Sequence, residues 1–133
     1  MPRISISLLS TMMLASSAFA GSAPTLPATA KKLTGPEIVA AFDKKTLSFV
    51  NFTKDKSLTG TNTYDFTAKT VTGTYVYGDK DKGNFSVAIK IKNDMYCWTP
   101  DKQKDNCENV FSDISGFYDV DAKGKVLTLQ KPQ

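Results

Sequence analysis

The chain has 133 residues, of which 17 are lysine or arginine and 13 are aspartate or glutamate, and it carries a formal net charge of +4 with no histidine. Its length fits one domain, and the lack of histidine excludes histidine-based triads and metal sites. Arg3 is the only arginine, so the rest of the chain has no guanidinium for bidentate capture of phosphate or guanine. The lysines alternate with acidic residues, as in residues 79–82, so we expect solvated loops and no nucleic-acid partner.

The N-terminal 20 residues are typical of a bacterial secretory signal peptide. Arg3 precedes an uncharged run over residues 4–19, and Ala18, Phe19 and Ala20 form a small-x-small site that signal peptidase accepts. The run is too short and too rich in serine for a stable transmembrane helix, although an uncleaved anchor is the alternative. We therefore expect cleavage after Ala20, a periplasmic or secreted product, and no stable membrane anchor.

Residues 21–32 are predicted to form a flexible leader, because Pro24 and Pro27 interrupt regular structure. The rest of the chain, residues 33–133, then forms a single β-rich domain.

A helix is predicted directly after the leader. Thr34 is placed to cap it, Glu37 stands three residues later and completes a capping box, and Pro36 suits the first turn. The helix should run to about Lys44 or Lys45. Its apolar stripe consists of Ile38, Ala41 and Phe42.

Short strands separated by turn-forming residues follow from Thr46 onward. In residues 84–92, apolar side chains alternate with small or charged ones, which predicts a strand with one face in the core. Asn93 and Asp94 then predict a tight turn into a strand over residues 95–99. The remaining expected strands cover residues 47–53, 62–68, 71–77, 108–111, 116–120 and 126–130.

The connections between these strands are too short for parallel crossovers, so the fold class is mainly β, an antiparallel meander. Such a sheet must hide its edges. We expect a small barrel or half-barrel, preceded by the short helix, which packs against an open end.

The two cysteines, Cys97 and Cys107, are predicted to form a disulfide that clamps a hairpin, since export places them where disulfides persist. In the chain-entropy model such a bond restricts the unfolded chain by roughly 2.5 to 3 kcal/mol. A catalytic or metal-binding thiol pair is the alternative, but CxxC spacing and further ligands are missing.

Most aromatic side chains are expected in the core. Tyr75, Tyr77, Tyr96 and Trp98 are the predicted exceptions, because their rings carry polar atoms suited to the mouth of a barrel. These four residues are the predicted ligand-binding side chains.

Paired carboxylates can hydrolyse glycosides, and several aspartates lie on or beside the expected strands: Asp65, Asp113, Asp119 and Asp121. None forms a recognisable acid–base arrangement, and Asp119 and Asp121 alternate with Val120 as a solvent-facing side would. We therefore predict no catalytic residue, no metal and no cofactor, and a protein that is not an enzyme.

Four short motifs give the chain a resemblance to a known family: LTGPEI at residues 33–38, YDF at 64–66 followed by Gly73, GNF at 83–85, and YCW at 96–98 followed by Cys107. With the exported leader, they resemble the small exported proteobacterial domains catalogued as Domain of Unknown Function 995. The resemblance covers nearly all of residues 33–130. It implies no catalytic residues, because the family has no assigned activity.

Three functions are compatible with the sequence. The first is an exported, non-enzymatic β-barrel that binds an unknown small apolar ligand, by analogy with lipocalin-like and avidin-like barrels. The second is a protein–protein interaction or inhibitor module of the cell envelope that uses the disulfide-clamped loop over residues 98–106; an exposed Trp98 would favour it. A cavity lined by Tyr75, Tyr77 and Tyr96 would favour the first. A weak hydrolase is the third.

Overall fold

The computed structural model describes residues 22–133. The predicted signal peptide and its cleavage after Ala20 lie outside the described residues. Within residues 22–133, no helix has both the length and the apolar character needed to cross a membrane.

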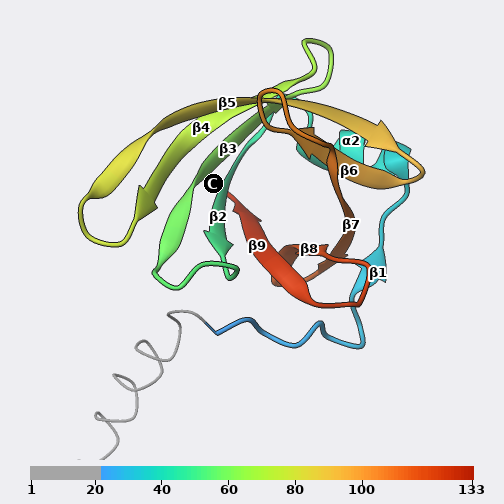
Figure 1. Ribbon diagram of the computed structural model, residues 1–133. Coiled ribbons are helices and arrows are strands. Elements are labelled where there is room, and N and C mark those ends of the chain that lie inside the picture. Colours follow the sequence, from blue (N-terminus) through green and yellow to red (C-terminus); the bar gives the residue numbers. More distant parts are fainter. Residues whose placement is uncertain (1–21) are drawn as a thin grey trace, which may run out of the picture.

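Eight antiparallel strands, β2 to β9, close into a barrel, and one short helix, α2, precedes them (Figure 1). Each barrel strand pairs with the next along the chain, and β2 pairs with β9 to complete the ring. The barrel strands are β2 (Thr46–Asn51), β3 (Leu58–Asp65), β4 (Thr70–Tyr77), β5 (Asp81–Lys92), β6 (Met95–Thr99), β7 (Asn106–Asp113), β8 (Gly116–Val120) and β9 (Val126–Pro132). A two-residue strand before α2, β1 (Lys31–Lys32), pairs with β7. The predicted antiparallel meander is confirmed, and it forms a closed barrel.

Helix α2 (Gly35–Phe42) begins as predicted and ends earlier than predicted. The Thr34 hydroxyl accepts from the Glu37 N–H at 3.3 Å, and the Glu37 carboxylate accepts from the Thr34 N–H at 2.9 Å. The helix stops because Asp43 is extended and Lys44 has a φ of 62°, which turns the chain into the barrel. Lys45 lies beyond the helix and still stabilises its end, because its ammonium donates to a carbonyl in the last turn.

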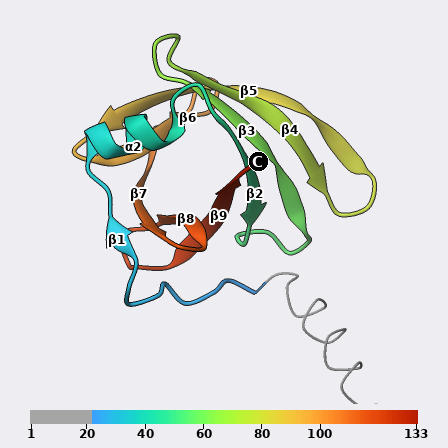
Figure 2. The ribbon, with the colours of Figure 1, turned by 180° about the vertical axis from the view of Figure 1, so that it is seen from behind.

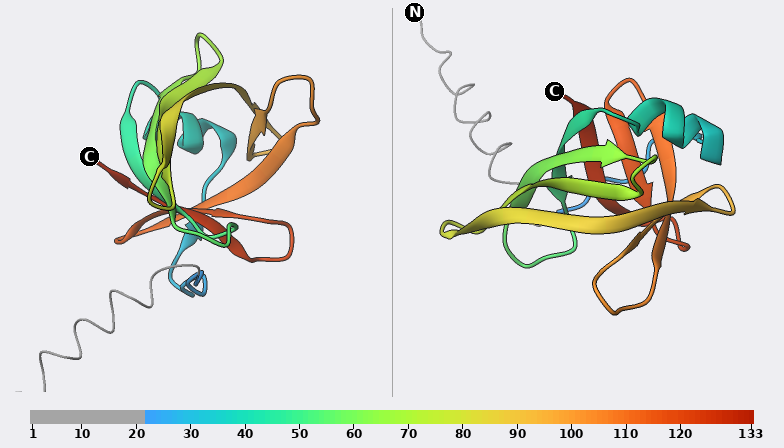
Figure 3. Two further views of the ribbon diagram at one scale, coloured as in Figure 1. Left: turned by 60° about the vertical axis from the view of Figure 1, so that its left-hand side comes forward. Right: turned by 90° about the horizontal axis from the view of Figure 1, so that it is seen from above.

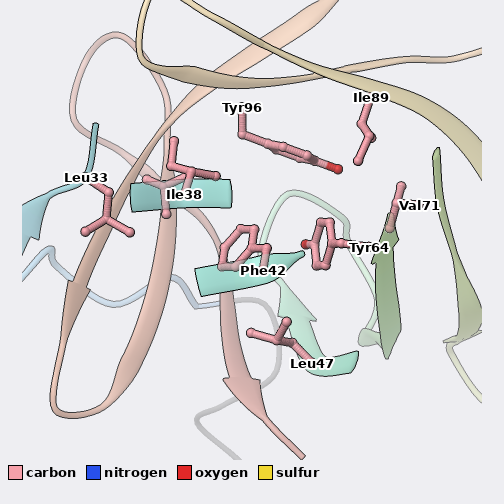
Figure 4. Packing of buried hydrophobic residues seen from close by; sticks show 9 residues of the cluster. Leu33, Ile38, Phe42, Leu47, Tyr64, Val71, Ile89 and Tyr96 are labelled. Atoms are coloured by element: carbon pink, nitrogen blue, oxygen red, sulfur yellow. The ribbon is translucent and has the colours of Figure 1, made fainter. Parts of the chain in front are cut away.

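The helix lies against one end of the barrel (Figures 2 and 3) and fills it with two side chains that are completely buried, Ile38 and Phe42. The Phe42 ring stacks on Tyr64 with centroids 4.7 Å apart and meets Phe117 edge-on at 5.1 Å. Figure 4 shows Phe42 beside Tyr64, with Tyr96 close to both rings and its centroid 5.7 Å from that of Tyr64. The hydrophobic core is therefore concentrated at the helix end of the barrel.

Strand β5 has the predicted alternation, because its apolar side chains pack in the barrel and the residues between them are exposed. The turn after it is also confirmed. Asn93 and Asp94 have φ values of 53° and 58°, and Lys92 pairs with Met95 across the turn. The Asp94 carboxylate accepts from the N–H of Gly35 at 2.7 Å, which ties this turn to the start of α2.

Strands β8 and β9 differ from β5, because beside the inward-facing Phe117 they also place polar side chains in the interior and carry an apolar outer face. Their outer face carries Tyr118 and Val120, which form a second apolar cluster together with Leu26 and Ala30 from the segment predicted to be a flexible leader. The prediction that Asp119 faces solvent is therefore wrong. Asp119 is only 4% exposed, because the apolar outer face of its strand is covered by the N-terminal segment.

Cys97 and Cys107 form the predicted disulfide. They are directly opposite each other on β6 and β7, with Cα atoms 4.0 Å apart, and Cys97 is fully buried. The bond joins two strands at the base of the connecting loop, whose residues 101–106 are exposed.

We expect the double substitution Cys97→Ala and Cys107→Ala to lower the free energy of unfolding by roughly 2.5 to 3 kcal/mol, because the unfolded chain gains the freedom that the bond removes. Urea denaturation measures the change. As a control, a reductant should lower the melting temperature of the wild type and leave the double variant unaffected. Equal stability of the two proteins would contradict a stabilising bond.

Strand β3 begins at Leu58, before the predicted start at residue 62, and so includes Gly60. Gly60 is opposite Phe49 on β2, and a Cβ atom at Gly60 would lie 1.9 Å from the Thr74 carbonyl oxygen and 2.8 Å from the Phe49 ring. A glycine is required there because a side chain would collide with the Thr74 carbonyl and also with the Phe49 ring.

Gly60→Ala should destabilise the protein by about 1–3 kcal/mol, because both neighbours of the new methyl group must move. Gly83→Ala is the matched control. Its methyl group would meet only the Tyr75 ring, at 3.1 Å or more, so the loss should be clearly smaller. Chemical denaturation of both variants compares them, and equal losses would show that neither the Thr74 carbonyl nor the Phe49 ring imposes the glycine.

Candidate functional site

A cavity of about 480 Å³ occupies the end of the barrel that α2 leaves unfilled. Its lining runs from the strand ends far from α2, such as Asn51 at the end of β2 and Tyr77 at the end of β4, inward to Tyr64 and Tyr96 of the core cluster. The turn between β4 and β5 projects on this side, away from α2 (Figure 3). The barrel therefore has one packed end and one hollow end.

The structure brings all four predicted ligand-binding residues to this one cavity: Tyr75, Tyr77, Tyr96 and Trp98. Tyr96 is buried, and the other three are partly buried. Trp98 therefore lies in the barrel wall, where its indole N–H donates to Glu108 at 3.3 Å. It is not an exposed tip of the loop over residues 98–106.

Tyr75 and Tyr77 stand at the mouth, and each hydroxyl donates to a carboxylate outside the barrel interior. Tyr75 donates to Asp81 at 3.2 Å, and Tyr77 donates to Asp55. The charge of Asp81 raises the pKa of Tyr75, and the hydrogen bond to Asp55 raises the pKa of Tyr77. With the hydroxyls held in this way, the rings remain as the surfaces that line the mouth.

A chain of hydrogen bonds crosses the interior of the barrel between the cavity and the core. Gln130 on β9 is completely buried. Its side-chain oxygen accepts from the Tyr64 hydroxyl at 2.5 Å and from the Asn62 amide at 3.0 Å. Its own amide donates to the Asp119 carboxyl at 3.0 Å. The chain fixes the Asp119 side chain in the interior.

Asp119 and Glu108 form a pair of acidic side chains in the cavity wall. Burial raises the pKa of Asp119 well above its ordinary value, and the negative charge of Glu108 adds to this effect. Burial also raises the pKa of Glu108 to about 6, with a further rise from Asp121, while the hydrogen bond from Trp98 opposes it. Near neutral pH the pair can therefore hold a proton, donate a hydrogen bond, or become ionised beside a cation.

Sequence reasoning found the aromatic lining and missed the polar interior, which consists chiefly of Glu108, Asp119 and Gln130. A signal for part of it was present. In residues 126–130 (VLTLQ), apolar and polar residues alternate, and the pattern was compatible with polar residues inside if the outer face was covered. The N-terminal segment that covers it could not be placed from local patterns.

The comparisons with known proteins returned no match: no family model matches the chain, no curated protein has a significantly similar sequence, and no solved structure has a significantly similar fold. The resemblance to Domain of Unknown Function 995 stays a prediction. The proposed function therefore depends on the geometry of the barrel.

The raised pKa of Glu108 predicts that the folded state binds a proton more tightly than the unfolded state does. The stabilisation that the protonated Glu108 carboxyl contributes is complete below the pKa of this group in the unfolded chain. It is lost as the pH rises through about 6. The change from 4.5 to about 6 corresponds to at most about 2 kcal/mol. We expect Glu108→Gln to make this decline smaller and to leave the part that comes from Asp119, whose pKa burial also raises. The measurement is the free energy of unfolding across mildly acidic to neutral pH.

Glu37→Gln is a control with the opposite sign. The backbone hydrogen bond at Thr34 lowers the pKa of Glu37, so its contribution is present at higher pH and is lost as the pH falls. Identical pH profiles for wild type and Glu108→Gln would show that Glu108 is not in a desolvated site.

Proposed function

We propose that the protein is an exported, non-enzymatic binding protein that holds a small, largely apolar ligand inside the barrel. The observation that carries this proposal is the cavity of about 480 Å³ that opens away from α2. Pockets for small ligands are typically concave, mostly apolar and provided with a few convergent polar groups. Here, rings and aliphatic side chains surround the few polar atoms of Asn62, Glu108 and Asp119.

Export, to the periplasm or outside the cell, is supported by the disulfide. Bonds such as Cys97–Cys107 persist in oxidising compartments and are rare in the reducing cytosol. The N-terminal sequence pattern points the same way.

The alternative, a protein–protein module that uses the loop over residues 98–106, lacks its expected anchor. Trp98 lines the cavity and bonds to Glu108, and the exposed residues 101–106 are polar or charged. Interface hot spots are usually large aromatic or arginine side chains, so the loop provides less for a partner than the cavity provides for a ligand.

A hydrolase that uses Glu108 and Asp119 as paired carboxylates is the third candidate. One feature favours binding: one oxygen of each carboxyl accepts from a side chain of the barrel, Asp119 from Gln130 and Glu108 from Trp98, which fixes both groups as hydrogen-bond acceptors of a binding site. Hydrolysis of a glycoside that Glu108→Gln abolishes would support the hydrolase.

Native mass spectrometry of the protein purified from the periplasm tests the binding function. We expect a bound small molecule in the wild type and its weaker retention in Val87→Phe, because Val87 lines the cavity and the larger ring would project into it. Ser86→Phe is the matched control, since Ser86 is the next residue on β5 and is exposed on the outer face. It should keep the ligand. Repeated preparations without added mass, or equal occupancy in the two variants, would count against the cavity.

A further inference from the structure

The charged side chains that line the cavity are unevenly distributed. Lys54 and Asp81 are exposed at the mouth, and Asp81 is bonded to Tyr75. The deeper wall carries Glu108 and Asp119, and no lysine is among the described residues that line it. The protein as a whole is basic, with 17 basic and 13 acidic residues. The acidic interior is therefore a local feature and does not follow from composition.

One oxygen of Asp119 indicates that the interior lacks a hydrogen-bond donor. Asp119 is 4% exposed, and its Oδ2 accepts from Gln130. Among residues 22–133, its Oδ1 is buried with no hydrogen-bond partner. A buried polar group without a partner typically costs about 1–3 kcal/mol. A ligand that brings a hydrogen-bond donor to this oxygen would recover that energy.

The surroundings of the two carboxyls suit a positive charge on an apolar body. Glu108 is directly opposite Tyr96 on the neighbouring strand, and Trp98 bonds to it. The faces of tyrosine and tryptophan rings attract cations, most strongly away from water. Phe85 and Val87 provide the apolar part of the same wall.

We propose that the ligand of this cavity is a small organic cation, an ammonium group on an apolar or aromatic body, whose N–H groups donate to Asp119 and Glu108. This inference rests on the proposed binding function and adds the chemical class of the ligand. Charge-assisted hydrogen bonds of this kind are roughly twice as strong as neutral ones. The paired acids provide the specificity, and the rings and aliphatic side chains provide the contact area.

Binding of an ammonium should release protons in mildly acidic solution. In the absence of a cation, burial raises the pKa of both carboxyls, that of Glu108 to about 6, and the charge of Glu108 raises the pKa of Asp119 further. A cation favours their ionised forms, so affinity should increase as the pH rises through about 6.

Other titratable groups face the pair. Asp121 acts on Glu108 with a negative charge, and Tyr64 and Tyr96 face Asp119 with pKa values raised by burial. The two tyrosines therefore stay neutral in this range. At the mouth, Lys54 and Asp81 carry opposite charges.

Three probes with the same phenyl ring and different charges test the proposal: phenethylamine as the cation, phenethyl alcohol as the neutral molecule and hydrocinnamate as the anion. Trp98 is the only tryptophan and lines the cavity, so its fluorescence reports occupancy in the full mature chain. At neutral pH we expect phenethylamine to bind at least about 10-fold more tightly than the alcohol. Hydrocinnamate should bind more weakly than the alcohol.

The variant Glu108→Gln with Asp119→Asn should lose the preference for the amine and keep the affinity for the alcohol. Asp79→Asn with Asp101→Asn is the matched control, because it makes the same change in net charge on exposed loops and should keep the preference. Glu108→Gln alone should reduce the preference if the double variant does not fold. Calorimetry in two buffers of different ionisation enthalpy, in mildly acidic solution, should detect proton release with the amine for the wild type only.

Equal binding of phenethylamine and phenethyl alcohol would overturn the cation proposal and leave the binding function standing, with a neutral ligand. Failure of all three probes at millimolar concentration would also overturn it. The binding function is judged separately, by the mass added to the wild type and to the Val87→Phe and Ser86→Phe proteins.

Discussion

The pairing of β2 with β9 closes the sheet into a ring, and the rest of the structure depends on that closure. In a closed antiparallel barrel, alternate side chains of every strand share one interior. The helix provides Ile38 and Phe42 to that interior, and these two side chains fill only one end. The other end remains hollow and is lined mostly by rings and aliphatic side chains, with a few polar groups among them. The closed barrel therefore has one packed end and one end that can hold a ligand.

Local signals in the sequence predicted a large part of this fold. The capping box at Thr34 and Glu37, the tight turn at Asn93 and Asp94 and the alternation along β5 each depend on residues close together in the chain. The disulfide followed from the count of two cysteines. The four aromatic residues proposed for the barrel mouth line one cavity, because period-two alternation placed them on the inner face.

Long-range packing accounts for what the sequence did not predict. In β8 and β9 the polar residues face inward because Leu26 and Ala30 cover the apolar outer face. No residue pattern within these strands predicts that the N-terminal segment covers them. The same reason explains why Asp119 was assigned to solvent. The early start of β3 at Leu58 was also missed, because the role of Gly60 depends on Thr74 and Phe49 on two other strands.

The polar interior is the energetically most costly part of the structure, because burying a carboxyl costs free energy unless surrounding groups hold it by hydrogen bonds. Carbon-detected NMR titration of the side-chain carboxyl of Asp119 tests it most directly. If Asp119 lies inside the barrel between Gln130 and Glu108, it should titrate well above the ordinary aspartate pKa of about 3.9. Titration at the ordinary value would place this side chain in water and contradict the described interior.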